Sequence, residues 1–364
     1  MGHTETRRYP MPMPFGWFQV GWSDDVAPGQ GIPLHYFGRH LVAWRSESGA
    51  AHVWDAFCPH LGAHLGVRAR IEGEEIVCPM HSWRYDASGT CIDIPYSTRL
   101  NKQAAVRVYP VVERNGLLFA WYHPDDIAPM WDIPELPEFG TDGGFSEVFR
   151  RQYRLGCHWQ EIAETQVDAA HIQAHLIDYE IAMNGGVRPD RPTMPQVDSY
   201  DTDGPIAHIR ISQNFPTPQG AVTGRIDTDV FGPGFAATWF TGLVDTLLLG
   251  CATPVDEGSC EVRFSFIVRT TGDAAATTRL GEAFIEEIHL RTVEDVEMWE
   301  AKAYVPKPLL AYGDGPIMQY RRWCEQFYAE GVEADLRPWT PPPLNGDVAG
   351  TPSRTSATAA APSA

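Results

Sequence analysis

The sequence predicts an α+β fold, in which an N-terminal all-β domain precedes a domain with an antiparallel sheet flanked by helices. Three observations support this prediction. Short strand-like runs alternate with turns over residues 17–122, and a proline-rich stretch follows at 123–143. Further along, strand-like runs between residues 206 and 269 lie between helical patterns at 158–176 and 275–303.

These composition shifts divide the chain into five expected segments. They are an N-terminal arm (1–15), the all-β domain (16–124), a linker (125–143), the sheet-and-helix domain (144–340) and a disordered tail (341–364).

Hairpins are expected to build the all-β domain. The runs 32–37 and 40–44 flank a Gly-Arg turn at 38–39, and the run 51–57 follows another turn. The later strand-like runs are 75–77, 83–85, 106–109 and 117–122. Such spacing of short strands indicates a small antiparallel barrel or sandwich.

In the second domain, a strand at 145–155 leads into the helix at 158–176. A loop rich in Gly, Pro and Asp at 177–194 is expected to border a pocket. The strand-like runs that follow are 206–211, 221–231, 236–249 and 261–269, and helical patterns occupy 275–303 and 317–328.

The bulk properties exclude several classes of function. The formal net charge of -19 argues against nucleic acid and anionic membrane surfaces as partners. The chain has no apolar run long enough for a transmembrane helix, and its first residues lack the apolar core of a secretory signal. Its 7 widely spaced cysteines do not suggest a disulfide framework, so we expect a cytoplasmic protein.

Four potential metal ligands lie in two loops of the all-β domain. Cys58 and His60 form a C-x-H motif, and Cys78 and His81 form a C-x2-H motif. Thiolates and imidazoles favour iron or zinc. The ligands could surround one structural zinc ion, or they could hold a Rieske [2Fe-2S] cluster with the cysteines on one iron and the histidines on the other.

The pattern favours the cluster. Zinc fingers usually pair cysteine with cysteine and histidine with histidine, whereas here each loop supplies one of each. The Cys-Pro-His-Leu-Gly and His-Ser-Trp sequences also resemble Rieske proteins. We interpret the nearby His64 as a loop histidine, and the other five cysteines as core or surface thiols.

A second candidate metal site lies in the helix predicted over residues 158–176. On a regular helix, Glu164, Asp168, His171 and His175 share a wedge of roughly 60°. Ionisable groups on one face of an otherwise apolar helix are costly to bury unless they are paired or bound to a metal. Two His and one carboxylate would leave open positions on an iron for oxygen and substrate. The alternative is a solvent-facing stripe that contains two histidines by chance.

The order of these features resembles the oxygenase components of Rieske non-haem iron oxygenases over about residues 15–330. Among them, the sequence is most similar to the 3-ketosteroid 9α-hydroxylase group. That similarity is carried by the Asp-Ile-Pro-Tyr sequence at 93–96, by Glu294 to Trp299 with Lys302, and by Gly313 to Pro316 before Arg321. The resemblance implies a catalytic domain of the helix-grip type.

It also implies roles for individual residues. Cys58, His60, Cys78 and His81 match the cluster ligands, and His171, His175 and Asp295 match the ligands of a mononuclear Fe(II). Asp168 matches an aspartate that links the iron histidine to the cluster of a neighbouring subunit.

Two points stay open at this stage. Glu294 and Glu297 compete with Asp295 for the carboxylate role, and the three could simply form an exposed acidic helix face. The family usually spaces its two iron histidines five residues apart, whereas His171 and His175 are four apart, which suits an undistorted helix. We interpret Glu164 as support for the helix or its hydrogen-bond network.

The implied protein is a homotrimeric, NAD(P)H-linked monooxygenase. A separate reductase that carries flavin and iron-sulfur groups, with or without a ferredoxin, would deliver electrons to the cluster and on to the iron, where O2 reacts with a hydrophobic substrate. Candidate pocket residues are Tyr179, Met183, Phe231, Phe235, Trp239, Phe240 and Leu247 to Leu249, each of which could equally be core. A steroid-like substrate is implied by the resemblance, and demethylation or desaturation would use the same metal ligands. A Rieske-type electron carrier and a zinc-stabilised binding module are the alternatives from other classes.

Overall fold

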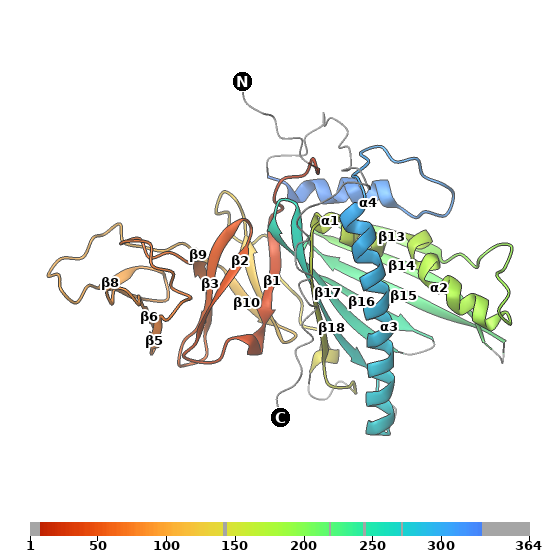
Figure 1. The fold of residues 1–364 in the computed structure, drawn as a ribbon, viewed down its shortest axis with the longest axis horizontal. Coiled ribbons are helices and arrows are strands. Elements are labelled where there is room, and N and C mark those ends of the chain that lie inside the picture. Colours follow the sequence, from red (N-terminus) through yellow and green to blue (C-terminus); the bar gives the residue numbers. More distant parts are fainter. Residues whose placement is uncertain (1–7, 141–143, 218–219, 243–244, 271, 330–364) are drawn as a thin grey trace, which may run out of the picture.

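The structure is a computed structural model that describes residues 8–140, 144–217, 220–242, 245–270 and 272–329. The first seven residues of the predicted arm, part of the linker and the whole predicted tail lie outside the described residues. The two predicted parts of the chain are both present, and they pack side by side (Figure 1).

Three small antiparallel sheets form the N-terminal part. One has the order β1-β11-β10, a second β2-β3-β4-β9 and a third β5-β6-β7-β8. Their bounds are β1 (Gly16–Trp22), β2 (Gly31–Tyr36), β3 (Arg39–Arg45), β4 (Ala51–Asp55), β5 (Arg70–Glu72), β6 (Glu75–Val77), β7 (Arg84–Tyr85), β8 (Cys91–Asp93), β9 (Val108–Tyr109), β10 (Val111–Arg114) and β11 (Leu117–Tyr122). The β5–β8 sheet lies at the end remote from the C-terminal part (Figure 1).

The predicted hairpin between β2 and β3 is confirmed, but its turn lies one residue earlier than the predicted Gly-Arg turn, because Arg39 already belongs to β3. Tyr36 pairs with Arg39 across a two-residue turn in which Phe37 and Gly38 both have positive φ, 58° and 66°. Positive φ at both central residues is the signature of the type I′ turn, whose twist matches that of the flanking strands.

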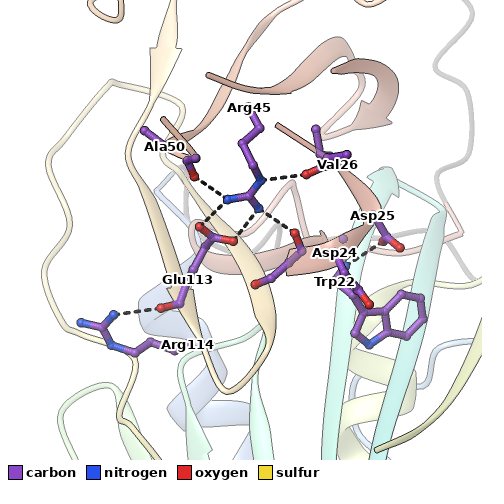
Figure 2. A network of polar contacts seen from close by, with 12 residues as sticks. Trp22, Asp24, Asp25, Val26, Arg45, Ala50, Glu113 and Arg114 are labelled. Carbon is purple, nitrogen blue, oxygen red and sulfur yellow. Dashed lines mark hydrogen bonds and ion pairs between the residues drawn. The ribbon is translucent and has the colours of Figure 1, made fainter. Parts of the chain in front are cut away.

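A buried arginine ties this part of the chain together (Figure 2). The Arg45 guanidinium donates to both carboxylate oxygens of Glu113, at 2.9 and 2.7 Å. It also donates to the carbonyls of Ser23, Val26 and Gly49. Because its donors are all satisfied, Arg45 can be 8% exposed and still link β3, β10 and the 3-10 turn η1 (Ser23–Asp25).

A seven-stranded antiparallel sheet organises the C-terminal part. Its order is β12-β18-β17-β16-β15-β14-β13. The bounds are β12 (Phe149–Leu155), β13 (Gln196–Asp203), β14 (Ile206–Thr217), β15 (Gly220–Phe231), β16 (Ala236–Thr241), β17 (Thr246–Asp256) and β18 (Ser259–Val268). Helix α3 (Ala274–Ala301) crosses this sheet (Figure 1) and packs on β12 and β18. Helix α4 (Ile317–Cys324) and the turn η4 (Glu325–Phe327) follow.

Two strand predictions need correction. The run 236–249 is two strands, β16 and β17, because the chain turns at Gly242, which has a φ of 112°. The edge strand β13 was not predicted, because its sequence, Gln-Val-Asp-Ser-Tyr-Asp-Thr-Asp, is mostly polar and exposed and lacks a buried apolar face.

Direct hydrogen bonds join the two parts. Trp22 donates its indole N–H to the Ser265 hydroxyl at 2.9 Å, and the Gly38 N–H donates to the Val255 carbonyl at 2.8 Å. The arm residues Tyr9 and Met11 are buried against the C-terminal part. In the described residues, we find no helix that is both long and apolar enough to span a membrane.

Candidate metal centres and substrate cavity

The two ligand loops of the N-terminal part have the same backbone conformation. The Cys58 N–H donates to the Ala63 carbonyl at 2.9 Å, and the Cys78 N–H donates to the Trp83 carbonyl at 2.8 Å. In each loop, the N–H of the fourth residue after the cysteine donates back to the cysteine carbonyl. That residue has positive φ in both loops, 75° at Gly62 and 57° at Ser82. Two equivalent turns therefore present two equivalent cysteines.

The cysteine sulfurs meet below the surface. Cys58 and Cys78 are 2% and 1% exposed. A hydrogen bond with Cys78, together with one from the Tyr85 hydroxyl at 3.0 Å, lowers the pKa of the Cys58 thiol to about 6, and the same pairing raises the pKa of Cys78. One of the pair is thus readily ionised, as a metal ligand must be. Tyr85, which sequence analysis treated only as a strand residue, is part of this site.

The two histidines lie beside each other at the loop tips. The ring centroids of His60 and His81 are 4.8 Å apart, and both side chains are partly exposed. The Trp83 ring stacks on His60 at 4.5 Å, and its N–H donates to the Tyr96 hydroxyl. His64 accepts the Gly66 N–H at Nδ1, in agreement with its interpretation as a loop histidine. Two converging thiols and two adjacent imidazoles fit the ligand set of a Rieske cluster.

The helix predicted over 158–176 is broken. It comprises α1 (Trp159–Ala163), the 3-10 turn η3 (Glu164–Gln166) and α2 (Ala169–Met183). Asp168 has extended φ and ψ and forms the N-cap of α2, where its carboxylate accepts the His171 N–H at 2.9 Å. The prediction that four ionisable groups form a single stripe on one helix is therefore wrong. The prediction of a loop from residue 177 is also wrong, because α2 continues to Met183.

Glu164 points away from the histidines. Its carboxylate accepts two hydrogen bonds from the Arg321 guanidinium of α4, at 2.6 and 2.8 Å. Both side chains are nearly buried, at 9% and 10% exposure. The interpretation of Glu164 as structural support is confirmed, and Arg321 is its partner.

Helices α2 and α3 bring three potential metal ligands together. His175 Nε2 lies 3.0 Å from Asp295 Oδ2 and 3.0 Å from His171 Nε2, and His171 Nε2 lies 3.3 Å from Asp295 Oδ2. The two histidines are one turn apart on α2, and Asp295 comes from α3. Within the part of the chain that the structure describes, these three side chains lie close enough together to hold one metal ion.

The competing carboxylates are not part of this group. Glu294 and Glu297 are exposed, and Glu294 pairs with Arg291 at 3.1 Å. Asp295 is 4% exposed, and its Oδ1 is buried without a hydrogen-bond partner among the described residues. Burial would raise the pKa of Asp295, but hydrogen bonds from His171 and His175 hold it below its ordinary value. An ionised, half-satisfied carboxylate beside two imidazoles fits a mononuclear iron.

A cavity of about 740 Å³ opens beside this triad. The sheet, α2 and α3 enclose it, and its lining includes His171, His175 and Asp295. Of the predicted pocket residues, Phe235, Phe240 and Leu248 line it, whereas Met183, Phe231, Trp239, Leu247 and Leu249 do not. The Tyr179 side chain lies outside the described part of the structure. The volume falls within the usual range for small-molecule sites.

Comparisons with known proteins agree with this geometry. Residues 16–110 match the Rieske [2Fe-2S] domain, and residues 120–328 match the 3-ketosteroid 9α-hydroxylase C-terminal domain. The chain is 31% identical to a 3-ketosteroid-9-alpha-monooxygenase oxygenase component from Rhodococcus rhodochrous, over 86% of this chain and 81% of that protein. It is 30% identical to a cholesterol 7-desaturase from Caenorhabditis elegans, over 90% and 80%.

Solved structures show the same fold. Apo dicamba monooxygenase superposes with a TM-score of 0.66 at 16% identity, covering 87% of this chain and 97% of that one. With both domain matches and the full-length relatives in place, the chain belongs to the Rieske oxygenases with a 3-ketosteroid 9α-hydroxylase C-terminal domain, and it is an oxygenase component that uses O2.

Proposed function

We propose that this protein is the terminal oxygenase of a multicomponent system and that it hydroxylates a hydrophobic, multi-ring, steroid-like substrate. One observation carries the proposal: the apolar cavity opens directly onto the His171, His175 and Asp295 triad. A rigid ring system placed there would have one edge beside the metal position. The names of the similar proteins, which refer to 3-ketosteroids and cholesterol, support the same class of substrate.

Each residue set has a distinct part in the proposal. Cys58, His60, Cys78 and His81 would hold the [2Fe-2S] cluster, and the triad would hold Fe(II). When bound, these groups supply electrons and activate O2. The electrons would come from NAD(P)H through a separate reductase. The residues themselves fix the ligand geometry, and the apolar cavity walls exclude water from the reacting carbon.

Desaturation is the second candidate reaction, and a specific similarity favours it. The cholesterol 7-desaturase matches this chain over as large a share of its length as the hydroxylase does. Removing two hydrogen atoms requires the same ligands as inserting one oxygen atom. The position of the substrate carbon in the cavity would then decide the product.

A chemical test separates these possibilities. We would load the purified protein with iron and sulfide, reduce it, expose it once to O2 with a 3-ketosteroid or a sterol, and identify the product by mass spectrometry. A gain of one oxygen supports hydroxylation, and a loss of two hydrogens supports desaturation. Absence of any product from either steroid class would contradict the proposal. A sample without acid-labile sulfide would indicate a zinc module, and two iron atoms per chain instead of three would indicate an electron carrier.

We further propose that Asp168 links the iron site to the cluster of the next subunit in a trimer. In a single chain, Asp168 also caps α2 through the His171 N–H. The two roles can be separated, because asparagine caps helices as well as aspartate does but carries no charge. We expect Asp168→Asn to retain stability and both metal groups but to form little product in a single turnover. Normal product from Asp168→Asn, with loss of stability only in Asp168→Ala, would leave the cap as its sole role.

A further inference from the structure

One buried cross-strand pair of the cavity floor is polar. Strands β15, β16, β17 and β18 form the floor, mostly through alternate residues, as expected for one face of a sheet. Most of these residues are apolar or small. Thr228 and Thr238, however, are direct partners across β15 and β16, and both line the cavity.

The two hydroxyls have more hydrogen-bonding capacity than the protein uses. Thr228 Oγ1 and Thr238 Oγ1 lie 3.0 Å apart, and within the described residues this is the only hydrogen bond that either hydroxyl makes. They are 2% and 9% exposed. Two hydroxyls carry two protons, and the bond between them uses one, so one O–H remains available to an acceptor.

Two other threonines of the cavity, Thr165 and Thr292, differ in this respect. The hydroxyls of Thr165 and Thr292 donate to the carbonyls of Ile162 and Ile288, each at 2.7 Å, within their own helical segments. They have no free proton to offer. A buried donor without an acceptor is costly, so the free O–H of the Thr228 and Thr238 pair favours a ligand that accepts it.

The pair lies in the middle of the cavity floor. The Val230–Ala236 pair lines the cavity on one side of it, and the Ile226–Phe240 pair lines it on the other. Its cross-strand row continues through Leu248 to Phe266, and Phe266 packs on Phe284 of α3 with ring centroids 6.3 Å apart. Asp295 is eleven residues further along α3, which is about 16 Å of helix. The polar pair and the triad are therefore separate features of one cavity.

We infer that Thr228 and Thr238 form a specificity-determining contact for a ketone or hydroxyl oxygen of the substrate. This inference rests on the proposed steroid-like substrate for its shape. The remaining O–H would donate to a ketone, and the oxygen lone pairs could also accept from a hydroxyl. The contact would fix the position of the ring system in the cavity and so determine which carbon lies beside the triad.

Paired ligands test the inference. We would titrate iron-loaded protein under anaerobic conditions, without reductant, with androstenedione and with its two analogues that each lack one ketone oxygen. Quenching of tryptophan fluorescence would report Kd. In the wild type, we expect removal of one of the two oxygens to weaken binding by about tenfold, as for loss of one hydrogen bond. In Thr228→Val/Thr238→Val, the same comparison should differ by less than about twofold.

Matched variants control for packing. Thr228→Ser/Thr238→Ser keeps both hydroxyls and should restore the tenfold ratio. Thr292→Val removes a cavity hydroxyl that is already bonded, so its ratio should remain that of the wild type. Unchanged cluster absorbance and iron content would confirm that each variant is folded.

The outcomes are distinct. A wild type that binds all three steroids equally, or a double valine variant that keeps the wild-type ratio, would overturn the role of the pair. A wild type that binds no steroid would overturn the steroid-like substrate instead. In that case the ratio of the Kd values of phenanthrene and hydroxyphenanthrene, compared between the wild type and the double valine variant, tests the role of the pair by the same criterion.

Discussion

The buried ion pair between Glu164 and Arg321 gives the sharpest stability prediction. Arg321 donates two parallel hydrogen bonds to Glu164, and the side chains are 10% and 9% exposed. Replacing Arg321 by Met removes both bonds and a third one to the Val305 carbonyl. It leaves Glu164 as a buried, unpaired charge whose remaining hydrogen bond, among the described residues, comes from the neutral Gln160 amide. Removing one partner of such a pair costs about 3–5 kcal/mol. That is a large fraction of the roughly 5–15 kcal/mol by which domains are stable.

Urea unfolding followed by circular dichroism measures this loss. As a control, Arg39→Met breaks an exposed pair with Asp55, whose side chains are 43% and 30% exposed. Its cost should be at most about 1 kcal/mol. The double variant Glu164→Met/Arg321→Met removes both charges and should recover most of the loss. The reasoning would be refuted if Arg321→Met cost no more than Arg39→Met, or if the double variant were as unstable as the sum of its single variants.

Three further predictions concern His158, Gly315 and Asp295. Burial lowers the pKa of His158 from 6.5 to about 3. Between these two pKa values, the unfolded chain therefore binds one more proton than the folded chain. The contribution of His158 to the free energy of unfolding is fully present above pH 6.5 and should decrease below it by up to about 1.4 kcal/mol per pH unit. His158→Asn should reduce this pH dependence, as measured by urea unfolding between about pH 7.5 and 5. Gly315→Ala would place a Cβ 2.0 Å from the Val167 carbonyl oxygen, whereas at Gly313, also at positive φ, the nearest atom would be 3.8 Å away; calorimetry should find Gly315→Ala less stable than Gly313→Ala by more than about 1 kcal/mol. Asp295→Asn should reduce iron from three atoms to two per chain without changing the cluster absorbance, and the exposed Glu297→Gln should change neither; full iron content in Asp295→Asn would remove that residue from the ligand set.

The metal motifs could be predicted from sequence because they depend on short spacings. The C-x-H and C-x2-H motifs each lie within one turn, so the loop conformation follows from four or five residues. The pairing of His171 with His175 follows from the helical repeat alone. Choosing Asp295 over its neighbours relied on a resemblance, and the structure supplies the physical reason: of the acidic residues 294, 295 and 297, only 295 is buried.

The break between η3 and α2 could not be predicted, because distant residues cause it. The local sequence from Glu161 to His175 contains neither Gly nor Pro, so nothing in it ends a helix. The Val167 carbonyl instead packs against Gly315, where no side chain would fit. Arg321 meanwhile holds Glu164 on the other side of the break. Both contacts come from residues some 150 positions later in the chain.

The break also explains why the four-residue histidine spacing is sufficient. On a regular helix, side chains four residues apart differ by about 40° in direction, whereas side chains five apart differ by about 140°. A spacing of five therefore needs a distorted helix to bring both rings to one ion. Here the chain changes direction at Asp168, before α2 begins. Helix α2 then runs undistorted through both histidines to Met183. Because the irregularity lies N-terminal to both histidines, their spacing can follow the ordinary helical repeat, and their ring centroids lie 4.4 Å apart.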